Sequence, residues 1–246
     1  MDELRAKCPW DKKQTFESLR HLTIEEMYEL TEAILENDVA GIRKELGDIL
    51  LHIVFYAKIA SETGDFTITD VIDSICEKLI FRHPHVFGNV SVNDEEDVKT
   101  NWEALKIKEG NKSILGGVPK SLPAMVKAHR IQDKARAVGF DWDIREQVWD
   151  KIDEELSELK TEIEKMDAEK MESEFGDLFF SMVNAARLYG IDPEAALERT
   201  NKKFINRFNY LEEHTIKAGR KLTSMTLDEM NIIWEEAKSV SHQENT

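Results

Sequence analysis

The residues best suited to chemistry in this sequence are carboxylates that occur twice in one pattern. Each set has two adjacent glutamates, a third glutamate three residues later, and a Glu-x-x-Asp motif that starts 16 residues further on. The first set is Glu25, Glu26, Glu29, Glu45 and Asp48, and the second is Glu154, Glu155, Glu158, Glu174 and Asp177. Every acid of the second set follows its counterpart by 129 residues. Because clustered carboxylates repel each other, packing alone gives little reason for this pattern, whereas a bound cation would explain it.

The spacing of the acids predicts that each set gathers on two facing helices. Glu26 and Glu29 are three residues apart and share one helix face, as do Glu45 and Asp48. A turn at Asn37 lies between the two pairs, so antiparallel helices joined by that turn would bring the pairs to the same height. Facing helices lie about 8–10 Å apart, a gap that glutamate side chains can span.

Four or five carboxylates without a histidine suit a hard cation with oxygen ligands, Mg²⁺ or Mn²⁺. The second set repeats the geometry of the first around Asp167. The predicted metal ligands there are Glu155, Glu158, Glu174 and Asp177, and a possible second set is Glu26, Glu29, Glu45 and Asp48. A di-iron bundle would need Glu-x-x-His on two helices, and that motif does not occur in the sequence. A helical scaffold with solvated acidic faces is the simpler alternative, and the repetition of two facing pairs argues against it.

The composition narrows the class of partner and the compartment. The chain has 246 residues and a net charge of −16, so it would repel phosphates, and we expect no direct binding of nucleic acid. Its two cysteines form no Cys-x-x-Cys pair, which argues against a disulfide scaffold or a cysteine-rich zinc site. No apolar run approaches the length of about 20 residues that a membrane-spanning helix needs. We therefore expect a cytoplasmic protein that has no membrane partner.

The repeat extends beyond the acids and divides the chain. The stretches EKLIFRH and NWEALK of the first half correspond to KKFINRF and IWEEAK of the second. A segment rich in Gly and Pro separates the halves and indicates a linker. We expect a first domain at residues 1–112, a linker at 113–121 and a second domain at 122–240.

The predicted fold class is all-α, with a four-helix unit made twice. The expected helices are residues 23–36, 39–63, 69–81 and 94–108, then 144–165, 168–189, 193–214 and 226–240. Thr23 and Glu26 resemble a capping box, so Thr23 is the expected N-cap of the first helix. The apolar content of the helix at 39–63 is nearly continuous, which predicts that it lies in the core.

The paired acidic motifs resemble the MazG-type nucleoside triphosphate pyrophosphohydrolases, an all-α family. Other stretches that carry the resemblance are CPWDKKQT (residues 8–15), RHPHVFG (82–88), VGFDW (138–142) and TNKKFINRF (200–208). The resemblance covers nearly the whole chain, including the duplication. It implies hydrolysis of nucleoside triphosphates to the monophosphate and pyrophosphate with Mg²⁺, a role in cleaning the nucleotide pool, and a homodimer formed through the helices.

The resemblance also assigns roles to particular residues of the second half. The acids would hold Mg²⁺, and Glu154 or another free carboxylate would accept the proton of the attacking water. Lys203 and Arg207 are four residues apart on one helix face and would bind phosphate oxygens. The predicted catalytic residues are thus Glu154, Glu155, Lys203 and Arg207, and the predicted substrate-binding residues are Lys170, Asn201, Lys203, Arg207 and Trp234.

The two halves differ beside their acids. Gly41 corresponds to Lys170, and Cys76 corresponds to Asn201. We therefore expect the second half to be catalytic and the first to be degenerate or structural. A regulatory module that binds nucleotide with little turnover is the alternative function.

Overall fold

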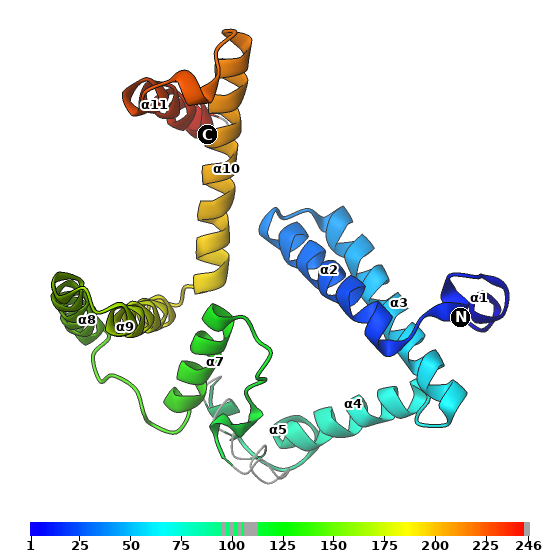
Figure 1. The fold of residues 1–246 in the computed structure, drawn as a ribbon. Helices are drawn as coiled ribbons and strands as arrows, with labels where there is room; N and C mark the ends of the chain where they lie inside the picture. The colour runs from blue at the N-terminus through cyan, green and yellow to red at the C-terminus, as the bar shows by residue number, and fades with distance from the viewer. Residues whose placement is uncertain (95–96, 99–100, 103–104, 106–112, 244–246) are drawn as a thin grey trace. The chain divides into compact units, whose positions relative to one another are not determined.

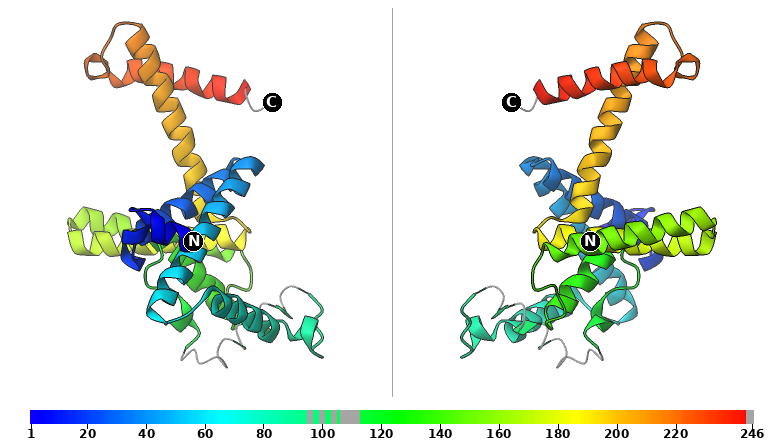
Figure 2. Two further views of the ribbon diagram at one scale, coloured as in Figure 1. Left: turned by 90° about the vertical axis from the view of Figure 1, so that its right-hand side faces the viewer. Right: turned by 90° about the vertical axis from the view of Figure 1, so that its left-hand side faces the viewer.

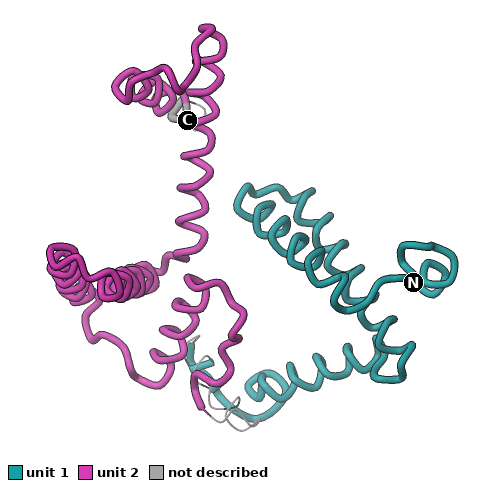
Figure 3. The backbone as a smooth tube through the Cα atoms, in the orientation of Figure 1, with its two compact units in different colours: residues 1–112 teal, residues 113–246 magenta. Residues whose placement is uncertain are grey.

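In the computed structural model, the protein is helical and divides into two compact units, residues 1–112 and 113–246 (Figure 3). The structure describes residues 1–246 except 95–96, 99–100, 103–104, 106–112 and 244–246, and it describes the side chains up to residue 240. The described residues contain no strand, which confirms the predicted all-α class.

The helices of the two units follow one another as Figure 1 labels them. Unit 1 contains α1 (Asp2–Lys7), η1 (Asp11–Lys13), α2 (Phe16–Leu35), α3 (Val39–Thr63), α4 (Ile68–Arg82) and α5 (Pro84–Phe87). Unit 2 contains η2 (Leu115–Gly117), α7 (Ala124–Arg136), α8 (Gln147–Lys165), α9 (Ala168–Leu188), α10 (Pro193–Lys217), η3 (Leu222–Ser224) and α11 (Leu227–Gln243). Among the described residues, no helix is both long and apolar enough to cross a membrane.

Unit 1 is built around an antiparallel hairpin of α2 and α3 (Figure 1). Asn37 has a positive φ of 56°, which reverses the chain, and the Asp38 side chain accepts a hydrogen bond from the backbone N–H of Ala40 at the start of α3. Buried residues Leu19, Phe55 and Ile59 form the apolar core between the two helices. The turn and this core fix how the acids of α2 face those of α3.

Unit 2 repeats the hairpin with α8 and α9, which lie side by side in Figure 1 and Figure 2. Met166 reverses the chain with a φ of 57°, and the Asp167 side chain accepts a hydrogen bond from the backbone N–H of Lys170. The core of this hairpin includes Val148, Ile152 and Ala185.

The first helix of the α2–α3 hairpin begins earlier than the sequence predicted. Thr15 is the N-cap of α2 and forms a capping box with Ser18. The prediction that Thr23 is the N-cap was wrong, because Thr23 lies within α2. Its hydroxyl donates to the carbonyl of Leu19 and also lies 2.7 Å from Nδ1 of His52.

The helix at 39–63, which was predicted to lie in the core, buries Phe55 and Ile59 but leaves Leu46, Leu50, Leu51 and Ile53 exposed by 41–59% in the single chain. Most of the helix expected at residues 94–108 lies outside the described residues. The helices α1 and α7, which the sequence analysis did not predict, precede the hairpins of their units.

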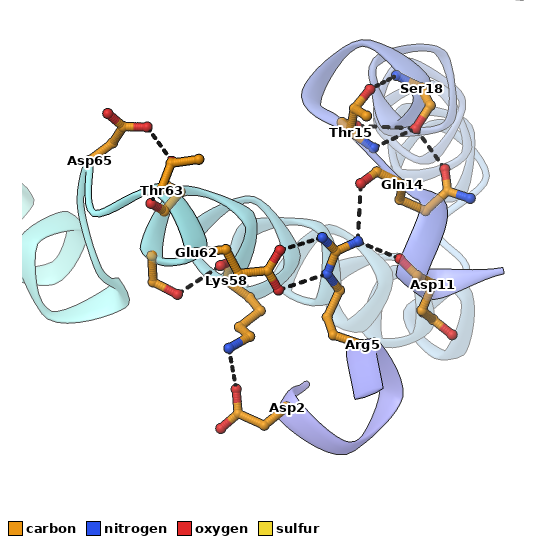
Figure 4. Close-up of polar contacts among 12 residues, drawn as sticks. Asp2, Arg5, Asp11, Gln14, Thr15, Ser18, Lys58, Glu62, Thr63 and Asp65 are labelled. Carbon is orange, nitrogen blue, oxygen red and sulfur yellow. Dashed lines mark hydrogen bonds and ion pairs between the residues drawn. The ribbon is translucent and has the colours of Figure 1, made fainter. Parts of the chain in front are cut away.

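Polar contacts tie the start of the chain to the far end of α3 (Figure 4). Arg5 donates from Nε to Glu62 at 2.9 Å and from Nη1 to the backbone carbonyl of Asp11 at 2.5 Å. Lys58 lies 2.8 Å from the carboxylate of Asp2. These contacts hold the CPWD stretch against the hairpin that carries the first acids.

Candidate functional site

The second acid cluster comprises Glu155, Glu158, Glu174 and Asp177, on the facing sides of α8 and α9. Glu155, Glu174 and Asp177 each offer a carboxylate oxygen within 4.8 Å of the other two. Glu155 is buried, with 6% of its surface exposed, and Glu174 is half-buried. Glu158 lies outside this group of three, but its negative charge contributes to the raised pKa of Glu174. The hairpin thus gathers acids that are about 20 residues apart in the sequence, because antiparallel neighbours meet at equal distances from their turn.

The first acid cluster comprises Glu26, Glu29, Glu45 and Asp48, on α2 and α3. Glu26, Glu29 and Glu45 bring oxygens within 4.8 Å of one another, and Glu45 is 6% exposed. Asp48 is outside the group of three, but its negative charge contributes to the raised pKa of Glu26. The two hairpins therefore gather their acids in closely similar ways.

The electrostatics of both clusters favour a cation. Burial, followed by the charges of Glu158 and Asp177, raises the pKa of Glu174 above its ordinary value. Burial, followed by the charge of Asp48, raises the pKa of Glu26 in the same way. A raised carboxyl pKa means that the folded protein holds negative charge there at a cost, and a cation would lower that cost.

Unpaired carboxylate oxygens supply a direct test of whether these residues fit a metal. In the described part of the chain, Oε2 of Glu45 and Oε2 of Glu174 are buried without a hydrogen-bond partner. A buried acceptor without a donor is costly, and a metal ion would satisfy it. An all-oxygen set of this kind suits a hard divalent cation, so both clusters fit such an ion.

Glu154, the predicted proton acceptor, lies beside the second cluster on the exposed side of α8. Lys151 bridges the neighbouring acids, with Nζ 3.1 Å from Glu154 and 2.7 Å from Glu155. Its hydrogen bond with Glu155, followed by that with Glu154, raises the pKa of Lys151 above its ordinary value. The contacts of Lys151 therefore stay within one helix.

A further acid on α8, Glu162, was not predicted from the sequence. Glu162 is half-buried, accepts a hydrogen bond from Lys165 at 2.6 Å, and has its other oxygen buried without a partner. Its charge contributes to the raised pKa of Glu174. The signal in the sequence was its position four residues after Glu158, which places it on the same helix face.

The predicted phosphate-binding and nucleotide-binding residues lie mainly on α10 and α11. Lys203 is exposed, whereas Arg207 is half-buried and has Nε buried without a hydrogen-bond partner. The amide of Asn201 donates to Glu198 at 3.1 Å. Trp234 of α11 packs against Phe204 of α10, with ring centroids 5.0 Å apart. Phe204 directly follows Lys203 in the sequence, so Trp234 packs against the immediate neighbour of Lys203.

Lys170 lies at the start of α9, where its Nζ is 3.7 Å from the carboxylate of Asp167. Among the described residues, no hydrogen bond or ion pair links the second acid cluster to Lys170, Lys203, Arg207 or Trp234. The roles predicted for these four residues therefore remain predictions.

Fold and site together define an all-α protein that carries a paired carboxylate cluster on each of two helix hairpins. The family model of the MazG nucleotide pyrophosphohydrolase domain matches the chain twice, at residues 14–87 and 145–211. Each match includes one complete acid cluster.

Curated relatives match over most of the chain. A Thermotoga maritima protein named nucleoside triphosphate pyrophosphohydrolase/pyrophosphatase MazG is 46% identical over 243 residues, covering 97% of this chain and 92% of the relative. An Escherichia coli K12 protein named nucleoside triphosphate pyrophosphohydrolase is 40% identical, covering 94% of this chain and 90% of the relative. The Bacillus subtilis protein YabN is 48% identical over 247 residues, which form 50% of its own length. The chain therefore belongs to the MazG family, as its motifs indicated.

Proposed function

We propose that this protein hydrolyses nucleoside triphosphates to the nucleoside monophosphate and pyrophosphate. The observation that supports this most is the second acid cluster, which lies within a family match, gathers three carboxylates and includes a buried oxygen of Glu174 without a hydrogen-bond partner. The alignments with two relatives that are named for this activity cover 92% and 90% of the length of those relatives. Cleaning of the nucleotide pool is the role that such a reaction would serve.

The proposed metal is Mg²⁺, with Mn²⁺ as a substitute, held by Glu155, Glu158, Glu174 and Asp177. When bound there, the ion would neutralise phosphate charge and make the α-phosphorus more open to attack by water. Glu155 is buried and Glu174 is half-buried, so packing limits the movement of both side chains. Glu162 adds negative charge to the same face of α8 and would strengthen the attraction for the ion.

The protein's own side chains would move the proton and hold the leaving group. Glu154 is exposed and next in sequence to the buried Glu155, so it can accept the proton of the attacking water. Lys203 and Arg207 would bind the phosphates that leave as pyrophosphate. Lys170, Asn201 and Trp234 would complete the nucleotide site.

We also propose that the active form is a homodimer. In the single chain, α9 exposes Phe175, Phe179, Phe180 and Met182 by 42–62%. Large apolar side chains gathered on one helix are typical of a protein–protein interface. The corresponding helix of unit 1, α3, exposes Leu46, Leu50 and Leu51 in the same way.

A product assay with matched variants tests the function. The full-length protein with Mg²⁺ and a panel of triphosphates should release monophosphate and pyrophosphate. Glu158→Ala should lower kcat/KM by about a hundredfold or more, because it removes a carboxylate of the catalytic cluster. Glu29→Ala, its counterpart in unit 1, should retain much of the activity.

The other outcomes are equally informative. Release of orthophosphate and diphosphate would contradict the proposed bond cleavage. Nucleotide binding without turnover would favour the regulatory module instead. Equal losses in Glu158→Ala and Glu29→Ala would contradict the assignment of catalysis to unit 2.

A further inference from the structure

The first acid cluster contains a positive charge that bridges its two helices. Nζ of Lys44 lies 2.8 Å from Glu45, 3.8 Å from Glu29 and 3.8 Å from Asp48. Glu29 belongs to α2, whereas Glu45 and Asp48 belong to α3. One ammonium group therefore contacts three of the four acids and cross-links the hairpin.

The second cluster has no lysine at the position that corresponds to Lys44. The equivalent position, 129 residues later, is Ser173. Lys151 approaches the second cluster from a different position and contacts Glu154 and Glu155, which both lie on its own helix. Its ammonium is therefore not a bridge between α8 and α9.

A second difference acts in the same direction. Glu162, which adds negative charge to the second cluster, corresponds to Ala33 in unit 1. Ala33 is buried, with 8% of its surface exposed. Each cluster thus has one lysine beside it, but Lys44 contacts three of the four predicted ligands whereas Lys151 contacts one of them, Glu155. The first cluster also has one carboxylate less than the second.

We propose that Lys44 is a built-in counterion that competes with divalent cations for the first acid cluster. This inference rests on the proposed use of the clusters as metal sites. Lys44 is 65% exposed and has a flexible stem, so its ammonium can leave the cluster when an ion enters. The first cluster then binds a divalent ion more weakly than the second, and α2 and α3 remain cross-linked at ion concentrations that fill only the second cluster.

Titration with Mn²⁺ tests this competition in the full-length chain. The first cluster is isolated by Glu174→Gln and Asp177→Asn, which remove two charges from the second with little change of shape. In that background, Lys44→Ala should tighten Mn²⁺ binding by about tenfold, because a positive charge within a few ångströms of the ion is removed. Lys217→Ala, which removes a lysine paired with Glu213 on α10, should leave the affinity unchanged.

The reciprocal variant keeps the test independent of how well Lys44→Ala folds. With the first cluster disabled by Glu26→Gln and Glu45→Gln, Ser173→Lys should weaken Mn²⁺ binding to the second cluster by about tenfold. Unchanged affinities in both Lys44→Ala and Ser173→Lys would overturn the proposal. Failure of the wild-type chain to bind Mn²⁺ at all would remove the metal centre itself, and this inference with it, whereas metal-dependent turnover with unchanged affinities would leave the proposed function standing.

Thermal unfolding supplies a readout that does not depend on activity. In EDTA, Lys44→Ala should lower the melting temperature of unit 1, because three acids lose their shared counterion. Saturating Mn²⁺ should raise the melting temperature of Lys44→Ala more than that of the wild type. An equal effect of Mn²⁺ on both proteins would contradict the competition.

Discussion

At the scale of single residues, each acid cluster contains a carboxyl group whose pKa is raised by folding. Glu174 and Glu26 both have pKa values above the ordinary 4.5, mainly because of burial and then of neighbouring carboxylates. A group whose pKa is raised by folding binds its proton more tightly in the folded state than in the unfolded state. Its contribution to stability is complete below the ordinary pKa and is lost as the pH rises through the raised value.

The direction of these two pKa shifts predicts how the stability of the protein depends on pH with and without metal. As the pH rises from below 4.5 through the raised pKa values of these two carboxyls, the protein in EDTA should lose the stability that their protonated forms contribute, whereas Mg²⁺ should restore it by neutralising the ionised acids. The gap between melting temperatures with and without Mg²⁺ should therefore widen as the pH rises. The double variant Glu26→Gln and Glu174→Gln, which cannot ionise at these positions, should show a smaller change. A gap that stays constant across this range would contradict the prediction.

At the scale of elements, ion pairs fasten the segment before each hairpin to the helix that carries Glu-x-x-Asp. In unit 2, Arg187 of α9 is nearly buried and donates to Asp141 at 3.0 Å and to Asn184 at 2.7 Å. The pKa of Asp141 is lowered because the bonds from Arg187 and the backbone N–H of Trp142 together outweigh its burial. In this way, the VGFDW stretch that carries part of the family resemblance has a structural role.

The Arg187–Asp141 pair gives a stability prediction. Arg187→Ala should destabilise the protein by about 3 kcal/mol, because it leaves a largely buried carboxylate without its main partner. Urea unfolding of the full-length chain would measure the change. Arg220→Ala, which removes a partly exposed partner of Glu229, should cost less than about 1 kcal/mol. Similar losses in the two variants would show that Arg187 stabilises the protein no more than a surface ion pair does.

At the scale of the whole molecule, the single chain leaves apolar helix surface uncovered. Leu50 of α3 and Phe179 of α9 are 59% and 62% exposed, although each of these helices also contributes to the apolar core of its hairpin. Burial of such a hydrophobic face against a second copy of the chain lowers the free energy, because it removes apolar surface from water. The helices that position the acids would then also form the interface, which links assembly to activity.

The predicted homodimer can be tested with one substitution on this surface. Light scattering at micromolar protein concentration should give the mass of two chains. Phe179→Glu should shift that mass to one chain and lower activity, because it places a charge in the apolar interface. Leu227→Glu, at an exposed position at the start of α11, serves as the control and should remain dimeric. A wild-type mass of one chain would refute the dimer.

The sequence alone was enough to group three of the predicted metal ligands, but it was not enough to place Thr23. Glu155, Glu174 and Asp177 could be grouped from spacing alone, because helix periodicity and the turn at Asp167 fix their faces and heights. Thr23 could not be placed in this way. The sequence around Thr23 is typical of a helix N-cap, but in the structure Thr15 caps α2 instead. Packing of α2 against α3 places Thr23 opposite His52.

The sequence by itself therefore determined the all-α class, the duplication and the two sets of acids, because all three follow from local periodicity and from comparison of one half with the other. Only the tertiary structure decided which further charges join each set. Lys44 and Glu162 occur in charge-rich helices where many residues could be solvated. Helix periodicity places Glu162 on the same face as Glu158, but whether Lys44 and Glu162 act on the acids of the facing helix depends on the rotation and packing of one helix against the next. For that reason, the difference between two nearly identical acid clusters became visible only once the hairpins were folded.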